Sequence, residues 1–196
     1  TLFLQAPNRK FTVPQAQPWK KYHTSEEIGS HFFDADGDGD LDLYVASGST
    51  EKPLGDRSYQ DRLYLNDGKG SFSESENALP RFSASTMTVV SADIDADGDM
   101  DLFVGGRNVP GAYPKSPNSF ILINENGTFK NRTSEWNSDL QFAGMVTGAV
   151  FADITNDNKP DLIICGEWSA IRFFENTGSG FKEITEKIGD PDLKGW

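Results

Sequence analysis

Sulfur ligands, histidines and long apolar stretches are nearly missing from this chain of 196 residues. Cys165 is its one cysteine, which excludes an internal disulfide framework and a cysteine-rich zinc site. The histidines number two, and no apolar stretch approaches the roughly 18 residues that a membrane-spanning helix needs. Basic residues are also scarce, since 18 Lys and Arg stand against 30 Asp and Glu for a formal net charge of −12. This acidity argues against nucleic acid and anionic membrane surfaces as partners, because both attract clusters of Lys and Arg. The lack of a long apolar stretch argues against direct membrane insertion.

The chain does not begin with Met, and no basic segment followed by an apolar one opens it, so we expect a processed or excised chain. Aromatic residues, in contrast, make up 12 % of the sequence, and there are 19 Gly and 10 Pro. This composition is typical of a folded chain with a core and many turns, and it excludes an acidic disordered tail.

Three acidic loops repeat at a nearly fixed spacing. They read DADGDGDLD at 34–42, DIDADGDMD at 93–101 and DITNDNKPD at 153–161, so they begin 59 and 60 residues apart. Each loop lies between two strand-like apolar stretches. A second repeated motif, the echo motif, follows each loop: LYLNDG, ILINENG and FFENTG each lead through a turn to a Phe. Four short strands per unit of about 60 residues predict the blade of a β-propeller.

The repeat predicts an all-β chain of four-stranded antiparallel blades. Three near-complete blades, each with one acidic loop, are expected at 12–73, 74–130 and 131–182. Residues 1–11 align with the last two strands of a blade, and 183–196 are expected to begin the next one. Because a closed ring needs about four to eight blades, we expect a piece of a larger propeller.

Carboxylates fall at positions 1, 3, 5 and 9 of the first two loops. Calcium is a hard cation that takes six to eight oxygen ligands, and alternating side chains of a tight loop can converge on it. Position 7 would offer its backbone carbonyl, and glycine at position 6 permits the sharp turn. The candidate calcium ligands of these loops are Asp34, Asp36, Asp38, Asp40 and Asp42 in the first, and Asp93, Asp95, Asp97, Asp99 and Asp101 in the second.

The third loop departs from this pattern. Its candidate ligands are Asp153, Thr155, Asp157, Lys159 and Asp161, which leaves three carboxylates beside a cation. We therefore expect Ca²⁺ at two strong sites and one weaker site.

Two other interpretations of the loops are an EF-hand and solvated turns. An EF-hand requires Glu at position 12 and a helix after the loop, but position 12 is Val45, Val104 or Ile164 and each exit is β-rich, so that interpretation fails. The loops could instead be solvated Asp/Gly turns. Three loops in register favour metal, because clustered carboxylates repel one another unless a cation neutralises them.

At these residues the sequence resembles the FG-GAP/VCBS repeats of integrin-α-like β-propellers. The resemblance rests on the acidic loops and on the Asn-x-x-Gly-x-Phe echoes. The stretches 105–114 and 144–150 look like those of large bacterial secreted or surface-anchored VCBS-repeat proteins. The resemblance implies that the loops bind Ca²⁺ between the first and second strands of each blade, where the ions stiffen the propeller.

The connections between the second and third strands should lie on the face opposite the acidic loops. They carry residues that a glycan or a protein partner would use, since aromatic and Arg side chains on loops of a rigid scaffold often mediate recognition. The candidate ligand-binding residues are Arg57, Tyr59, Arg107, Tyr113 and Trp168. The alternative for Tyr113, Trp168 and the linker residue Trp136 is core packing between blades. Open sheet edges should be covered by the remaining blades of the same or another chain.

These observations predict a calcium-binding, non-catalytic recognition or scaffold module of a secreted or cell-surface protein, in an extracellular, cell-surface or periplasmic location. The alternative is part of a polysaccharide-active enzyme, a lyase-type propeller that uses calcium near an acidic glycan. Such an enzyme would need a group such as Arg107 or Tyr113 beside the sugar. No catalytic motif singles out a residue for that role.

Overall fold

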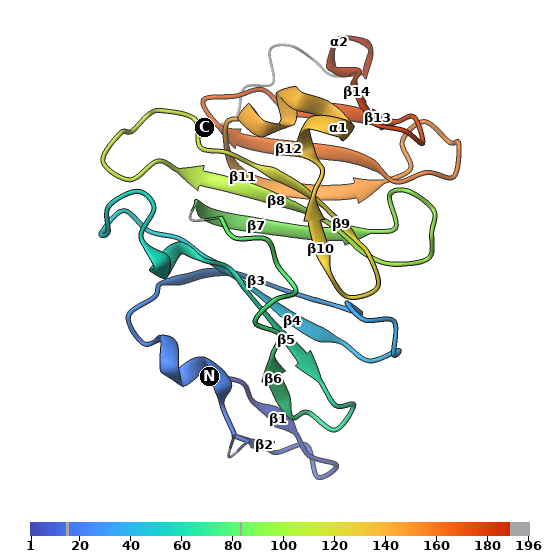
Figure 1. Ribbon diagram of the computed structural model, residues 1–196. Helices are drawn as coiled ribbons and strands as arrows, with labels where there is room; N and C mark the ends of the chain where they lie inside the picture. The colour runs from blue at the N-terminus through green and yellow to red at the C-terminus, as the bar shows by residue number, and fades with distance from the viewer. Residues whose placement is uncertain (15, 83, 189–196) are drawn as a thin grey trace.

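The computed structural model describes residues 1–14, 16–82 and 84–188, and most of its regular structure is short antiparallel strands (Figure 1). The strands are β1 (Leu4–Gln5), β2 (Phe11–Thr12), β3 (Glu27–Phe33), β4 (Asp42–Ser47), β5 (Arg62–Asn66), β6 (Phe72–Glu74), β7 (Ser85–Ala92), β8 (Asp101–Asn108), β9 (Phe120–Asn124), β10 (Phe129–Asn131), β11 (Met145–Ala152), β12 (Asp161–Glu167), β13 (Arg172–Asn176) and β14 (Phe181–Glu183). They form three four-stranded sheets in chain order, β3 to β6, β7 to β10 and β11 to β14, while β1 and β2 form a separate pair.

The predicted all-β class and the four-stranded antiparallel units are therefore confirmed. The sheets are stacked along the molecule like propeller blades (Figure 1). Their last strands end at Glu74, Asn131 and Glu183, each one residue beyond the end of the blade expected from the sequence repeat. Residues 189–196, most of the segment expected to begin a further blade, lie outside the described residues.

Short helices occupy several connections that the sequence indicated as loops. They are the 3-10 helices η1 (Pro18–Tyr22), η2 (Arg57–Tyr59) and η3 (Ser138–Phe142), and the α-helices α1 (Thr133–Asn137) and α2 (Thr185–Ile188). Burial explains the helices of the β10–β11 connection, because Leu140 of η3 is fully buried and Trp136 of α1 packs against Phe181 with ring centroids 5.5 Å apart. Trp136 is thus partly buried and packs against the core between the second and third sheets.

The middle sheet is buried on both faces. In β8, Leu102 and Val104 join the core shared with the first sheet, whereas Phe103 between them joins the core shared with the third. Successive side chains of a strand point to opposite faces, so an uninterrupted apolar run is what a doubly covered strand requires. The first and second sheets approach each other too closely for a side chain at Gly29 of β3, since a Cβ there would lie 1.9 Å from the Met87 carbonyl oxygen of β7.

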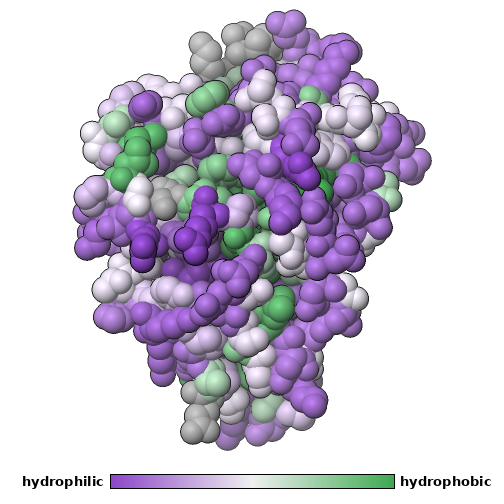
Figure 2. Space-filling model, viewed as in Figure 1, coloured by the Kyte–Doolittle hydropathy of each residue, from purple (hydrophilic) through white to green (hydrophobic). Residues whose placement is uncertain are grey.

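The connections divide between two edges of the stack (Figure 1). The loops from β3 to β4, from β7 to β8 and from β11 to β12 lie along the right-hand edge in that view, together with the turns that follow β5, β9 and β13. The connections from β4 to β5, from β8 to β9 and from β12 to β13 lie along the opposite edge. Figure 2 shows that the surface in this view is largely hydrophilic, with only small hydrophobic patches.

Candidate metal centres

Carboxylates converge in the first two acidic loops. One oxygen from each of Asp34, Asp36 and Asp42 lies within 4.8 Å of the others, and Asp93, Asp95 and Asp101 form an equivalent group. These are positions 1, 3 and 9 of the two loops. Two of the expected calcium loops therefore bring together carboxylates that could hold a metal ion.

The loop backbones explain this convergence. Residues at positions 4 and 6 of each loop have positive φ angles, a conformation that Gly and Asn adopt readily and that Ala adopts only with strain. The angles are 77° and 91° at Gly37 and Gly39, 62° and 100° at Ala96 and Gly98, and 61° and 64° at Asn156 and Asn158. Turned in this way, the backbone N–H groups of Gly39 and Gly98 donate to the position-1 carboxylates, at 3.0 Å to Asp34 and 3.1 Å to Asp93.

The carboxylate at position 9 clamps each loop to its sheet. Asp42 is fully buried, and it accepts one hydrogen bond from Ala35 N and another from Asn66 N, both at 2.8 Å. Asp101 is equally buried and accepts from Ile94 N at 2.9 Å and Asn124 N at 2.8 Å. The clamp therefore joins the start of each loop to the end of the third strand of the same sheet.

Asparagine side chains tie the first and second acidic loops to the next sheet. The Asn124 amide at the end of β9 donates to the Ala35 carbonyl of the preceding sheet's loop at 2.9 Å. Asn176 at the end of β13 donates in the same way to the Ile94 carbonyl at 2.8 Å. The sequence echo after each loop contains these residues, but sequence reasoning did not assign them this role. Loop geometry and sheet stacking are thus coupled.

Without a cation, burial and mutual repulsion make ionisation of the loop carboxylates unfavourable. Burial is the main cause that raises the pKa of Asp101 to about 7, with Asp95 and Asp97 adding to the effect. The pKa values of Asp42 and Asp95 are also raised, first by burial and then by neighbouring carboxylates. A bound cation would favour the ionised forms and so oppose each of these shifts.

The remaining candidate ligands of the two loops lie outside these groups. The Asp38 and Asp97 side chains are exposed and accept hydrogen bonds from Asp40 N and Asp99 N, at 3.0 and 2.9 Å. Asp40 Oδ1 is buried without a hydrogen-bond partner, and partial burial followed by repulsion from neighbouring carboxylates raises the pKa of Asp40. An orphaned carboxylate oxygen beside a group of carboxylates is a donor set that fits a hard cation such as Ca²⁺ or Mg²⁺.

The third loop does not assemble such a group among the residues that the structure describes. Asp161 keeps the clamp, since it accepts from Ile154 N at 3.0 Å and from Asn176 N at 2.8 Å. Lys159, however, places its ammonium 2.7 Å from Asp157 Oδ2, and this hydrogen bond is the main cause that lowers the pKa of Asp157. The lysine thus supplies internally the positive charge that a cation would bring, while Thr155 contributes no carboxylate.

On the opposite edge of the stack, the candidate ligand-binding residues lie in different environments. Tyr59 is 1 % exposed, and its hydroxyl donates to the Lys52 carbonyl at 2.7 Å, so it lies inside and is not available to a partner. Arg57 is exposed on the β4–β5 connection. Arg107, Tyr113 and Trp168 are linked: the Trp168 indole donates to the Tyr113 hydroxyl at 2.9 Å, and Arg107 pairs with Glu167, the neighbour of Trp168.

The FG-GAP-like repeat family model matches residues 34–104, a stretch that contains both carboxylate groups. This match supports the FG-GAP part of the resemblance, whereas closeness to VCBS-repeat proteins stays a prediction. No curated protein matches the chain. Within the described residues, no helix is both long enough and apolar enough to cross a membrane.

Proposed function

We propose that this chain is a calcium-binding, non-catalytic β-propeller module that serves recognition or assembly in a secreted or cell-surface protein. The observation that carries the proposal is the convergence of three carboxylates in each of two loops with the same backbone conformation. The matched repeat family and the blade-like stack of sheets support the propeller part.

Calcium is the cation that the donor set favours. The loops offer only oxygen ligands, which hard cations prefer, and they contain no His or Cys. Calcium tolerates six to eight ligands in irregular geometry, whereas Mg²⁺ demands a near-ideal octahedron. Extracellular modules commonly bind Ca²⁺ with dissociation constants of about 10⁻⁴ to 10⁻³ M, which suits an extracellular, cell-surface or periplasmic location. The third loop, with Lys159 against Asp157, would bind Ca²⁺ most weakly.

The role of calcium would be to stabilise the fold. A cation that binds the folded loops but not the unfolded chain raises stability by mass action. Thermal unfolding of this chain in EDTA, in Ca²⁺ and in Mg²⁺ tests this role. The expected result is a rise in melting temperature with Ca²⁺ and a smaller rise with Mg²⁺. A cooperative transition that neither cation shifts would show that the loops are solvated turns.

The positive charge that a lyase would set against an acidic sugar is already paired with a carboxylate, and this favours a non-catalytic role. Arg107 is bound to Glu167 at 2.6 Å, and the Tyr113 hydroxyl accepts the Trp168 indole N–H. Incubation with uronic-acid polymers tests the enzymatic alternative, because a lyase produces unsaturated ends that absorb ultraviolet light. Calcium-dependent growth of this absorbance would replace the recognition proposal by the enzymatic one.

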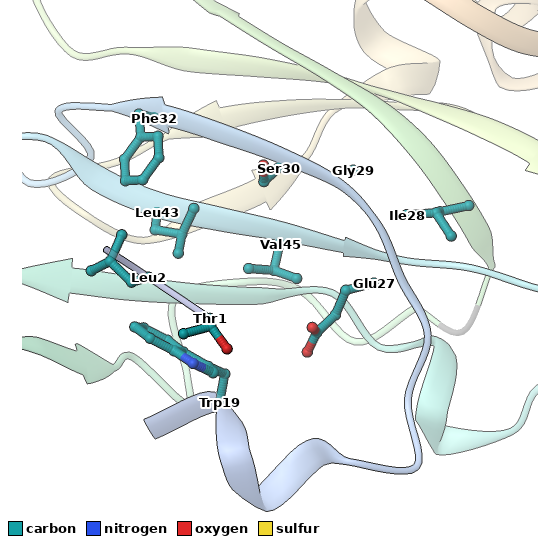
Figure 3. A pocket seen from close by; sticks show the side chains of 10 residues that line it. All are labelled: Thr1, Leu2, Trp19, Glu27, Ile28, Gly29, Ser30, Phe32, Leu43 and Val45. Carbon is teal, nitrogen blue, oxygen red and sulfur yellow. The ribbon is translucent and has the colours of Figure 1, made fainter. Parts of the chain in front are cut away.

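The N-terminal pair of strands supports further blades as partners, from the same or another chain. The third strand of each four-stranded sheet pairs with a neighbour on both sides, whereas β1 pairs with β2 alone among the described residues. Beside it lies a hollow of about 390 Å³, where Trp19 and Leu2 face Leu43 and Phe32 (Figure 3). Strands of a preceding blade would cover this apolar surface and pair with β1.

A further inference from the structure

A pocket opens on the edge opposite the acidic loops, between the second and third sheets. Its volume is about 420 Å³, which falls within the range of about 300–1,000 Å³ that is typical of small-molecule sites. The β8–β9 connection, the start of β11 and the end of β12 each contribute to the wall. The lining residues are Tyr113, Pro114, Ser116, Gly144, Met145, Glu167, Trp168 and Ser169.

Two exposed aromatic side chains line this pocket. Trp168 is 78 % exposed and Tyr113 is 61 % exposed, and the hydrogen bond between indole N–H and phenol oxygen joins them at 2.9 Å. Trp168 also has a φ of +59°, a strained conformation for a bulky residue. Strain of this kind is concentrated at functional sites, and an exposed indole does not contribute to core packing. The pair therefore offers a pre-arranged aromatic surface.

An ion pair borders the same surface, since Glu167 lines the pocket and Arg107 of β8 binds its carboxylate. Arg107 Nη1 lies 2.6 Å from Glu167 Oε2, and both side chains remain about a quarter exposed, at 26 % and 27 %. One contact leaves the other guanidinium N–H groups and the second carboxylate oxygen for a ligand. Because the two charges neutralise each other, the ion pair presents donors and acceptors beside the pocket without a net formal charge.

We propose that this pocket binds a neutral saccharide, an inference that rests on the proposed recognition function and names its ligand class. A pyranose ring has an apolar C–H face that packs on an aromatic ring, and its rim of hydroxyls both donates and accepts hydrogen bonds. The aromatic pair and the Arg107–Glu167 pair match those two features.

Other ligand classes fit the pocket less well. An acidic glycan meets the net charge of −12, and no cation lines the pocket to offset it. A cationic ligand would find the Glu167 carboxylate already neutralised by Arg107. A proline-rich peptide is held in aromatic grooves partly by indole N–H donation to its carbonyls, and the Trp168 N–H is occupied by Tyr113.

The test is a titration of the whole chain, in millimolar Ca²⁺, followed by the indole N–H resonances in two-dimensional NMR spectra. The Trp168 resonance is identified by its loss in Trp168→Phe, and the other indoles act as internal references. The probes are the neutral hexasaccharides of the malto, cello, laminari, manno and xylo series. Oligogalacturonate, chitosan oligomers and oligoproline represent the competing classes.

The expected result is saturable movement of the Trp168 resonance with at least one neutral hexasaccharide. Trp168→Ala should weaken that binding by about tenfold or more, as truncation of a central aromatic contact does. Phe11→Ala, which removes an aromatic ring that is 64 % exposed at the far N-terminal hairpin, should leave it unchanged. The exposed location of Trp168 predicts an unaltered melting temperature in Trp168→Ala.

The inference is overturned if no neutral probe moves the Trp168 resonance, if Trp168→Ala binds as well as the parent chain, or if an acidic, cationic or peptide probe binds more tightly. Melting temperatures of the same samples with and without Ca²⁺ separate this failure from failure of the proposed function. A chain that calcium stabilises but that binds no neutral saccharide loses the ligand class alone.

Discussion

Two aspartates of the first loop should respond to the same substitution in different ways, and the difference can be estimated from their contacts. Asp36 is exposed and accepts one long hydrogen bond, from Asp38 N at 3.3 Å. Asp42 is fully buried and accepts two bonds of 2.8 Å from Ala35 N and Asn66 N. Both belong to the same carboxylate group. Asp36 is therefore a candidate ligand only, whereas Asp42 is a candidate ligand and the clamp of the loop.

In EDTA, Asp36→Asn should change the free energy of unfolding by no more than about 0.5 kcal/mol, as expected for a surface substitution. Asp42→Asn should lower it by about 1.5–3 kcal/mol, because an amide NH₂ then faces a backbone N–H that donated to a charged oxygen. For a chain of this length each kcal/mol corresponds to about 2–4 °C, so Asp42→Asn should melt about 3–12 °C lower.

In calcium, Asp36→Asn should melt at a lower temperature than the parent chain, because it lacks a ligand of the first calcium site. If the site binds at about 10⁻⁴ M, a hundredfold excess of free Ca²⁺ contributes about 2.7 kcal/mol. Losing that contribution lowers the melting temperature by about 5–11 °C relative to the parent chain in the same buffer.

Calorimetric or circular-dichroism melts of both variants in EDTA and in Ca²⁺ measure these effects. Asp157→Asn, the same change in the third loop, is the control and should leave the calcium response of the parent chain intact. The reasoning is refuted if Asp36→Asn responds to calcium like the parent chain, or if Asp42→Asn melts normally in EDTA.

Three further outcomes are expected. Burial raises the pKa of Asp101 to about 7, above its unfolded value of 3.8, so its contribution to calcium-free stability is complete below about pH 4 and is lost as pH rises through about 7. Calcium, which favours ionised Asp101, should reduce that loss in melts across this pH range. Tyr44→Phe removes the phenol that donates to buried Asp61 Oδ2 at 2.7 Å, and it should cost about 1.5–3 kcal/mol in urea unfolding; an unchanged midpoint would contradict the role of this bond. The double variant Thr155→Asp/Lys159→Asp restores the acidic pattern of the third loop, so titration calorimetry should find one more strong calcium site in it than in the parent chain.

The acidic loops could be predicted from the sequence because their determinants are local. The carboxylates at alternate positions, and the Gly or Asn residues that adopt positive φ, lie within nine residues of one another. The repeat of about 60 residues then indicated four strands per unit, and the structure has four-stranded sheets. The difference between the loops was also visible, since Thr155 and Lys159 break the pattern.

The contacts between elements could not be predicted in this way. The clamp partner of Asp42 is Asn66, 24 residues away, and Asn176 reaches the Ile94 carbonyl across 82 residues. Trp168 and Tyr113 are 55 residues apart and lie on connections of different sheets, so their hydrogen bond depends on how the sheets stack. Tyr59 was expected at the surface from its place in a connection, but η2 turns its ring into the interior.

Titration calorimetry of the EDTA-treated chain with Ca²⁺ counts the bound ions. We expect two strong sites per chain, with Asp36→Asn and Asp95→Asn each removing one and the double variant removing both. Additional weak binding would belong to the third loop. Absence of saturable calcium binding, or strong binding that survives in the double variant, would contradict the assignment of the two carboxylate groups as calcium sites.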